Sequence, residues 1–170
     1  GTFTPATGAT TSTFTYFLNG TAPCVDDESI ATVTINAQPV AGTDGGTLVC
    51  DSSTSSIDLY SLITGEDSGG TWTQTSGSGG TFNAIAGTYI PATGATTSTF
   101  TYTLQGTAPC INDSSIATVN INPQHIAGFD GSITICDSNS AVIDLFSLIS
   151  GEQIGGTWTQ VSGTGGTFNP

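Results

Sequence analysis

Four cysteines are the most reactive side chains in this sequence, and they occur at a fixed spacing. Cys110 follows Cys24 by 86 positions, and Cys136 follows Cys50 by the same 86. No two cysteines form the CxxC pair of a zinc or redox motif. This pattern favours structural disulfides, which form and persist in oxidising compartments.

The acidic residues are the second group with chemical potential. The chain has 13 Asp and Glu, no Lys or Arg and one His, so its formal net charge is −13. A nucleic-acid binder needs cations against phosphates, so this composition excludes nucleic acid as a partner and disfavours anionic lipid headgroups. Solvent, backbone N–H groups or bound metal must compensate the carboxylates. Calcium takes about six to eight oxygen ligands, and the candidates on loops and turns are Asp26, Asp27, Glu28, Asp44, Asp113 and Asp130.

These residues belong to a repeat that covers the whole chain. Residues 87–122 are a second copy of residues 1–36, and residues 91–102 are identical to residues 5–16. A period of about 86 residues is the length of one small β-sandwich module. The repeat therefore predicts a tandem array and leaves nothing over for a separate catalytic domain.

The repeat also predicts the domain boundaries. We expect residues 37–122 to form a complete module, residues 1–36 to be the C-terminal half of a preceding module, and residues 123–170 to be the N-terminal half of a following one. The natural protein is then longer than this chain. The linker at residues 36–40 is very short, so adjacent modules should hold a restricted angle and form a semi-rigid rod.

Strand signals dominate within each module. Apolar and polar residues alternate at positions 100–104 and 117–121, and the turn-rich stretch 105–113 between them predicts a closing β-hairpin. Helix signals are weak because Gly, Ser and Thr are abundant and Met, Lys and Arg are absent. Seven short strands predict an all-β, immunoglobulin-like sandwich. The large side chains expected in its cores are Trp72, Trp158, Tyr16 and Tyr102.

Two disulfide patterns are compatible with the repeat. The preferred one pairs Cys50 with Cys110, closing a loop of about 60 residues worth roughly 4 kcal/mol in the chain-entropy model. However, bonded cysteines need Cα atoms within about 7 Å, and these two turns lie at opposite ends of a standard sandwich. In that layout each cysteine bonds one in a neighbouring module, as a ladder. In both patterns Cys24 and Cys136 find partners outside this chain, and free thiols or metal ligation are the remaining alternatives.

The calcium hypothesis has a competing interpretation, in which solvated loop acids keep the surface soluble. Residues 112–114 retain one of the three acids at 26–28, and Gln153 stands where the other copy has Asp67. The only histidine, His125, lies in a linker and is not expected to be a catalytic base. No two acids are marked as converging on a cleft, so we expect no enzymatic activity.

The motifs AGTDG, LVCDS, IDLYSL, GGTWTQ, GGTFN, FTYTLQGTAPC and IATVNIN follow one another along the chain. This succession resembles the tandem modules of very large secreted surface proteins of Bacteroidetes, including the gliding-motility adhesins with SprB-type repeats. The resemblance covers the whole chain. It implies export by a type IX secretion system, display on the cell surface, and a role in adhesion or surface motility.

Two functions are compatible with these observations. The first is a structural stalk or filament segment of a secreted adhesin, with neighbouring modules, and other copies in a fibre, as its partners. The second is a binding module whose loops, such as residues 91–97, contact glycans or a solid surface. Residues 91–97 are identical to residues 5–11 and lack aromatic residues, which favours the first function. No apolar run approaches the roughly 18 residues of a membrane span, so no membrane insertion is expected.

Overall fold

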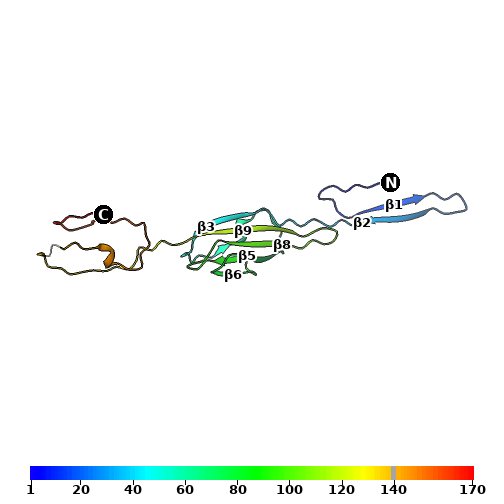
Figure 1. The fold of residues 1–170 in the computed structure, drawn as a ribbon. Coiled ribbons are helices and arrows are strands. Elements are labelled where there is room, and N and C mark those ends of the chain that lie inside the picture. Colours follow the sequence, from blue (N-terminus) through cyan, green and yellow to red (C-terminus); the bar gives the residue numbers. More distant parts are fainter. Residues whose placement is uncertain (139–140) are drawn as a thin grey trace. The chain divides into compact units, whose positions relative to one another are not determined.

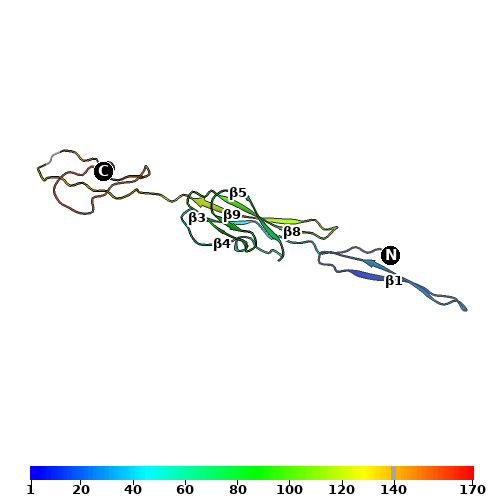
Figure 2. The ribbon, with the colours of Figure 1, turned by 90° about the horizontal axis from the view of Figure 1, so that it is seen from below.

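The computed structural model describes residues 1–138 and 141–170. The chain divides into two compact units, Gly1–Pro123 and Gln124–Pro170. The described residues form nine strands and two short 3-10 helices, so the protein is nearly all-β. The strands between residues 37 and 122 lie side by side and form two sheets (Figures 1 and 2).

The larger sheet has four strands. They are β3 (Gly45–Cys50), β9 (Asp113–Asn122), β8 (Ser98–Leu104) and β5 (Thr71–Ser76), in the order β3-β9-β8-β5. β3 runs parallel to β9, whereas β8 is antiparallel to both β9 and β5. The first and last strands of residues 37–122 are therefore neighbours that point in the same direction.

The smaller sheet has three strands. They are β4 (Ile57–Asp58), β7 (Thr88–Ile90) and β6 (Thr81–Asn83), in the order β4-β7-β6. The 3-10 helix η1 (Tyr60–Leu62) follows β4 directly. Phe82 and Tyr89 of this sheet each contact Phe100 of the larger sheet, with ring centroids 5.0 and 4.9 Å apart. The two sheets thus pack face to face, as a β-sandwich does.

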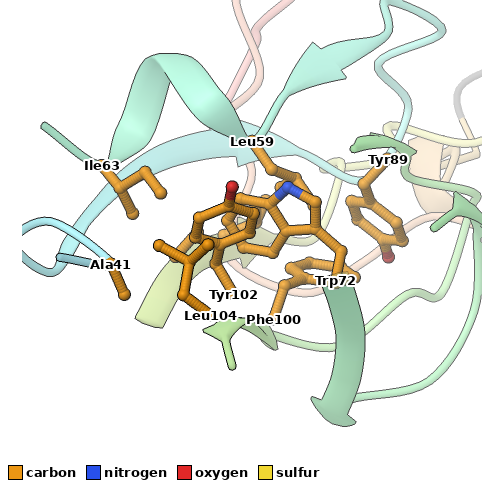
Figure 3. Packing of buried hydrophobic residues seen from close by; sticks show 10 residues of the cluster. Ala41, Leu59, Ile63, Trp72, Tyr89, Phe100, Tyr102 and Leu104 are labelled. Carbon is orange, nitrogen blue, oxygen red and sulfur yellow. The ribbon is translucent and has the colours of Figure 1, made fainter. Parts of the chain in front are cut away.

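Strand alternation builds the core between the sheets. Successive side chains of a strand point to opposite faces, and every second residue of β8, from Ser98 to Leu104, is buried. Trp72 and Tyr102, two predicted core residues, are both buried. Their rings lie 5.2 Å apart, and Figure 3 shows them gathered with Phe100 and Leu59.

A glycine is required beside this aromatic cluster. Gly87 has a φ of +64°, and a Cβ atom there would lie 2.8 Å from Trp72 Nε1 and 2.6 Å from the Tyr60 ring. Such contacts are too short for any side chain, and positive φ also favours glycine. This position therefore explains the glycine that begins the repeated stretch at residue 87.

Strands β1 (Ser12–Leu18) and β2 (Asp27–Val33) form a separate antiparallel hairpin. Its register is the same as that of β8 and β9, since Ser12 pairs with Val33 as Ser98 pairs with Val119. Tyr16 is nevertheless 67% exposed. The prediction that Tyr16 is a core residue is wrong for this chain, because no second sheet formed by the described residues packs against the hairpin.

The unit Gln124–Pro170 repeats several local contacts of the complete sandwich. A bridge joins Phe129 to Ser150, and η2 (Leu145–Leu148) occupies the position equivalent to η1. Trp158 is half-buried and lies edge-on to Phe146, with ring centroids 5.5 Å apart at 75°. Tyr60 and Trp72 make the same contact at 5.5 Å and 80°.

Candidate functional site

The four cysteines form no disulfide with one another. Cys50 ends β3 and pairs with Asn122, the last residue of β9, whereas Cys110 precedes Asp113, the first residue of β9. At ~3.3 Å per residue, β9 separates these two positions by roughly 30 Å. A disulfide needs Cα atoms within about 7 Å. The predicted Cys50–Cys110 disulfide is therefore wrong, because the parallel pairing of β3 puts the two cysteines at opposite ends of β9.

Cys110 lies instead against the segment that enters the sandwich. Its Sγ donates to the Asn36 carbonyl oxygen at 3.3 Å. Asn36 Nδ2 donates to the Ala108 carbonyl at 2.8 Å, and Gln38 Nε2 donates to the Ile111 carbonyl at 2.9 Å. These contacts hold the end of the β8–β9 hairpin on residues 36–38.

The other two cysteines are exposed. Cys24 lies in the turn between β1 and β2, the position equivalent to Cys110. Cys136 accepts a hydrogen bond from Ser138 Oγ at 3.3 Å, and this bond lowers the pKa of the Cys136 thiol. Cys50 and Ser52 make the equivalent contact at 3.1 Å. The cysteine at this position therefore contacts the hydroxyl of the serine two residues later in both copies.

The acidic residues act mainly as acceptors for backbone N–H groups. Asp44 Oδ1 accepts from Ile116 N at 2.8 Å, and Asp113 Oδ2 accepts from Ala41 N at 2.8 Å. Both bonds tie the first residues of the sandwich to β9. A carboxylate that accepts backbone hydrogen bonds needs no cationic partner.

Two further hydrogen bonds from a backbone N–H to a side-chain oxygen persist where the repeat replaces an acid by an amide. Asp26 Oδ1 accepts from Gly20 N at 2.8 Å, and Asn112 Oδ1 accepts from Gly106 N at 2.9 Å at the equivalent position. The requirement at this position is therefore an oxygen acceptor and not a negative charge.

The second such pair links the module entry to the turn before the tryptophan strand. Asp67 Oδ2 accepts from Val40 N at 2.9 Å, and Gln153 Oε1 accepts from Ile126 N at 3.2 Å. The reverse backbone bonds, from Asp67 N and Gln153 N, are also present in both copies. An amide thus performs the same structural task as the carboxylate.

The candidate calcium ligands do not gather. Among residues 1–138 and 141–170, no group of three or more His, Cys, Asp or Glu could hold a metal ion. Asp27 and Glu28 lie on the exposed strand β2, opposite Leu18 and Phe17, and Asp130 is exposed.

Residues 91–97, the predicted contact loop of a binding module, are held by the sandwich. Asp51 is buried, and its Oδ2 accepts from Gly94 N at 3.0 Å. Thr96 N donates to the Ser78 carbonyl at 2.9 Å. Asp51 was not among the predicted site residues, although Cys-Asp-Ser recurs at residues 50–52 and 136–138 and could have indicated it.

A small hollow lies beside the aromatic cluster. Tyr60, Asp67 and Tyr102 are among the residues that line it, and its volume is about 180 Å³. Ligand pockets usually measure about 300–1,000 Å³. The Tyr102 hydroxyl donates to the Asp67 carbonyl at 2.8 Å and accepts from Gly70 N at 2.9 Å, so its polar tip is already engaged. Burial raises the pKa of the Tyr60 hydroxyl above its ordinary value.

Hydroxyl groups cover the outer face of β5 and β8. Thr75 Oγ1 lies 3.0 Å from Thr99 Oγ1 and 3.4 Å from Thr101 Oγ1, and Ser76 Oγ lies 2.6 Å from Thr99 Oγ1. These hydroxyls hydrogen-bond to one another across the strands. Period-2 threonine is also the ordinary solvent face of a strand.

Comparisons with protein-family models, with curated proteins and with solved structures gave no match. None of the helices among the described residues has the length and apolar character needed to cross a membrane.

Proposed function

We propose that this chain is a spacer segment of a secreted cell-surface adhesin, built from tandem immunoglobulin-like modules that hold a binding region away from the cell. The observation that carries the proposal is the recurrence of the same turns, caps and ring contacts 86 residues apart, as in the Tyr60–Trp72 and Phe146–Trp158 pairs. A unit repeated with its internal contacts intact suits a protein that needs length.

The strand order supports the immunoglobulin-like assignment. The order β4-β7-β6 corresponds to strands B, E and D of an immunoglobulin sandwich, and β9-β8-β5 corresponds to G, F and C. β3 is then the first strand, paired with the last one at the edge of the larger sheet. Modules of this kind are common spacers in surface proteins because their two ends lie far apart.

The placement of polar groups supports a spacer over an enzyme or a calcium-dependent joint. Carboxylates at the ends of the sandwich accept backbone N–H groups, and two of them become amides in the other copy. We therefore propose that these acids shape turns and that the modules need no cofactor or structural Ca²⁺. The resemblance to Bacteroidetes surface proteins supports type IX export, cell-surface location and a role in attachment or gliding.

A glycan- or surface-binding module is the alternative function. The hydroxyl-covered face of β5 and β8 is the observation that favours it, since flat rows of threonine can contact carbohydrate. Against it, the large aromatic side chains of residues 37–122 lie mainly in the core, and sugar sites commonly present an exposed ring.

Small-angle X-ray scattering tests the spacer function. The full chain is compared with chains lengthened by one and two further 86-residue repeats. We expect the maximum dimension to rise by the same increment with each repeat, and growth as a compact globule would contradict the proposal. A glycan array probed with the same chains separates the alternative, because specific binding there would favour the binding module.

A further inference from the structure

We propose that Cys110 forms a disulfide with the first-strand cysteine of the preceding module. Each module is then cross-linked to the next by a covalent bond in addition to the backbone. The preceding module is the one to which residues 1–36 belong, and its cysteine stands at the position equivalent to Cys50. The inference rests on the proposed function, in which modules follow one another in tandem, and it adds which two sulfur atoms form a bond.

The first step is the position of the β3 cysteine inside a module. The pairing of β8 with β9 ends at Ser98 and Val119, so the last three residues of β9 pair with β3 alone. Cys50 pairs with Asn122 there, and Asp51 N donates to the Asn122 carbonyl at 2.9 Å. Asn122 therefore marks the place of the β3 cysteine.

The second step is that Asn36 is the Asn122 of the preceding module. β2 ends at Val33, the equivalent of Val119, where its pairing with β1 also ends. Beyond that point, Ile35 N donates to Thr11 Oγ1 at 3.2 Å, and the equivalent bond from Ile121 N measures 3.3 Å. Residues 34–36 thus follow the course of residues 120–122, and a completed preceding module would place its β3 cysteine opposite Asn36.

The third step is that Cys110 already lies at Asn36. Its Sγ is 3.3 Å from the Asn36 carbonyl oxygen, and hydrogen bonds from Asn36 and Gln38 fix the hairpin end around it. Paired strands are about 4.8 Å apart, and disulfide-bonded Cα atoms are about 4.4–6.8 Å apart. Two cysteines that both adjoin Asn36 can therefore approach each other to the separation that a disulfide spans.

The bond forms by oxidation of two thiols. Two S–H bonds break, one S–S bond forms, and two protons and two electrons leave. A small-molecule disulfide such as oxidised glutathione accepts them and becomes two thiols, by exchange through a mixed disulfide. An oxidising extracellular compartment supplies this class of oxidant.

The test lengthens the full chain at its N-terminus with a copy of residues 37–86, which completes the preceding module up to Gly1 and adds one cysteine. The chain is refolded with reduced and oxidised glutathione, alkylated, cleaved with chymotrypsin and mapped by mass spectrometry without reduction. Trypsin is unsuitable because the chain has no Lys or Arg. We expect a disulfide between the added cysteine and Cys110, with Cys24, Cys50 and Cys136 alkylated.

Cys24 provides the matched control, because it occupies the same hairpin position as Cys110 one repeat earlier. Cys110→Ser should abolish the disulfide, whereas Cys24→Ser should leave it intact. A bond from the added cysteine to Cys24 would overturn the proposal, as would complete alkylation of a chain that is folded by circular dichroism. If scattering shows that this reduced chain is still longer by one module, the disulfide proposal is wrong but the spacer function stands. A compact globule would contradict both the disulfide and the spacer function.

Discussion

Asp67 and Gln153 occupy the same position in the two copies and make the same hydrogen bond to the chain that enters the module. The pair separates two properties of a carboxylate, its charge and its acceptor oxygen. Only the acceptor oxygen is common to both copies. The same holds for Asp26 and Asn112.

This equivalence predicts how Asp67 variants behave. Asp67→Gln should change the free energy of unfolding by less than about 0.5 kcal/mol, because the amide oxygen still accepts from Val40 N. Asp67→Ala should destabilise by about 1 kcal/mol, the usual net value of one hydrogen bond. Urea unfolding followed by circular dichroism measures both changes. Equal losses in the two variants would show that the charge matters.

Single residues were also where sequence reasoning was least complete. The repeat identified Trp72 and Tyr102 as core residues, and both are buried. It gave Tyr16 the same role, but burial depends on a facing sheet that periodicity within one strand does not reveal. Asp51 was missed because its task, accepting from Gly94 N, depends on a loop distant in sequence.

At the scale of elements, alternation predicted the closing hairpin well. β8 and β9 cover the two expected stretches, and their buried faces follow the apolar residues. The parallel pairing of β3 with β9 was not predictable in the same way, because strand partners depend on tertiary contacts. That pairing decides the position of Cys50, so the error in the disulfide followed from an unknown neighbour and not from a misread strand.

The core between the sheets gives a prediction at this scale. Trp72→Ala should destabilise the sandwich by roughly 3–5 kcal/mol, because it removes a buried indole from contact with Tyr60 and Tyr102. Hydrogen exchange of the β8 amides measures the loss as reduced protection. Trp158→Ala is the control, and it should leave β8 protection unchanged because Trp158 belongs to the other compact unit.

At the scale of the whole molecule, the formal charge of −13 has no Lys or Arg to balance it. Ion pairs with those residues therefore contribute nothing to stability, and hydrogen bonds from backbone N–H groups and solvent compensate the acids. The composition predicted that the carboxylates are compensated without Lys or Arg, but not which backbone N–H group donates to which carboxylate.

Chelation tests whether any cation shares this task. We expect the midpoint of thermal unfolding to stay within about 1 °C when EDTA or millimolar CaCl₂ is added, since a ligand stabilises only the state that binds it. Differential scanning calorimetry on the full chain gives the measurement. A clear rise with CaCl₂ that EDTA reverses would restore the calcium hypothesis.

The parallel ladder between β3 and β9 has a mechanical consequence. The chain enters at Gly45, opposite Ala117, and leaves at Asn122, opposite Cys50. In a chain without disulfides between modules, tension applied at these two points slides the strands lengthwise past each other, so the hydrogen bonds between them bear the load together and do not open one at a time. A module joined in this way resists pulling along its own axis, the direction in which a tether between a cell and a surface is strained.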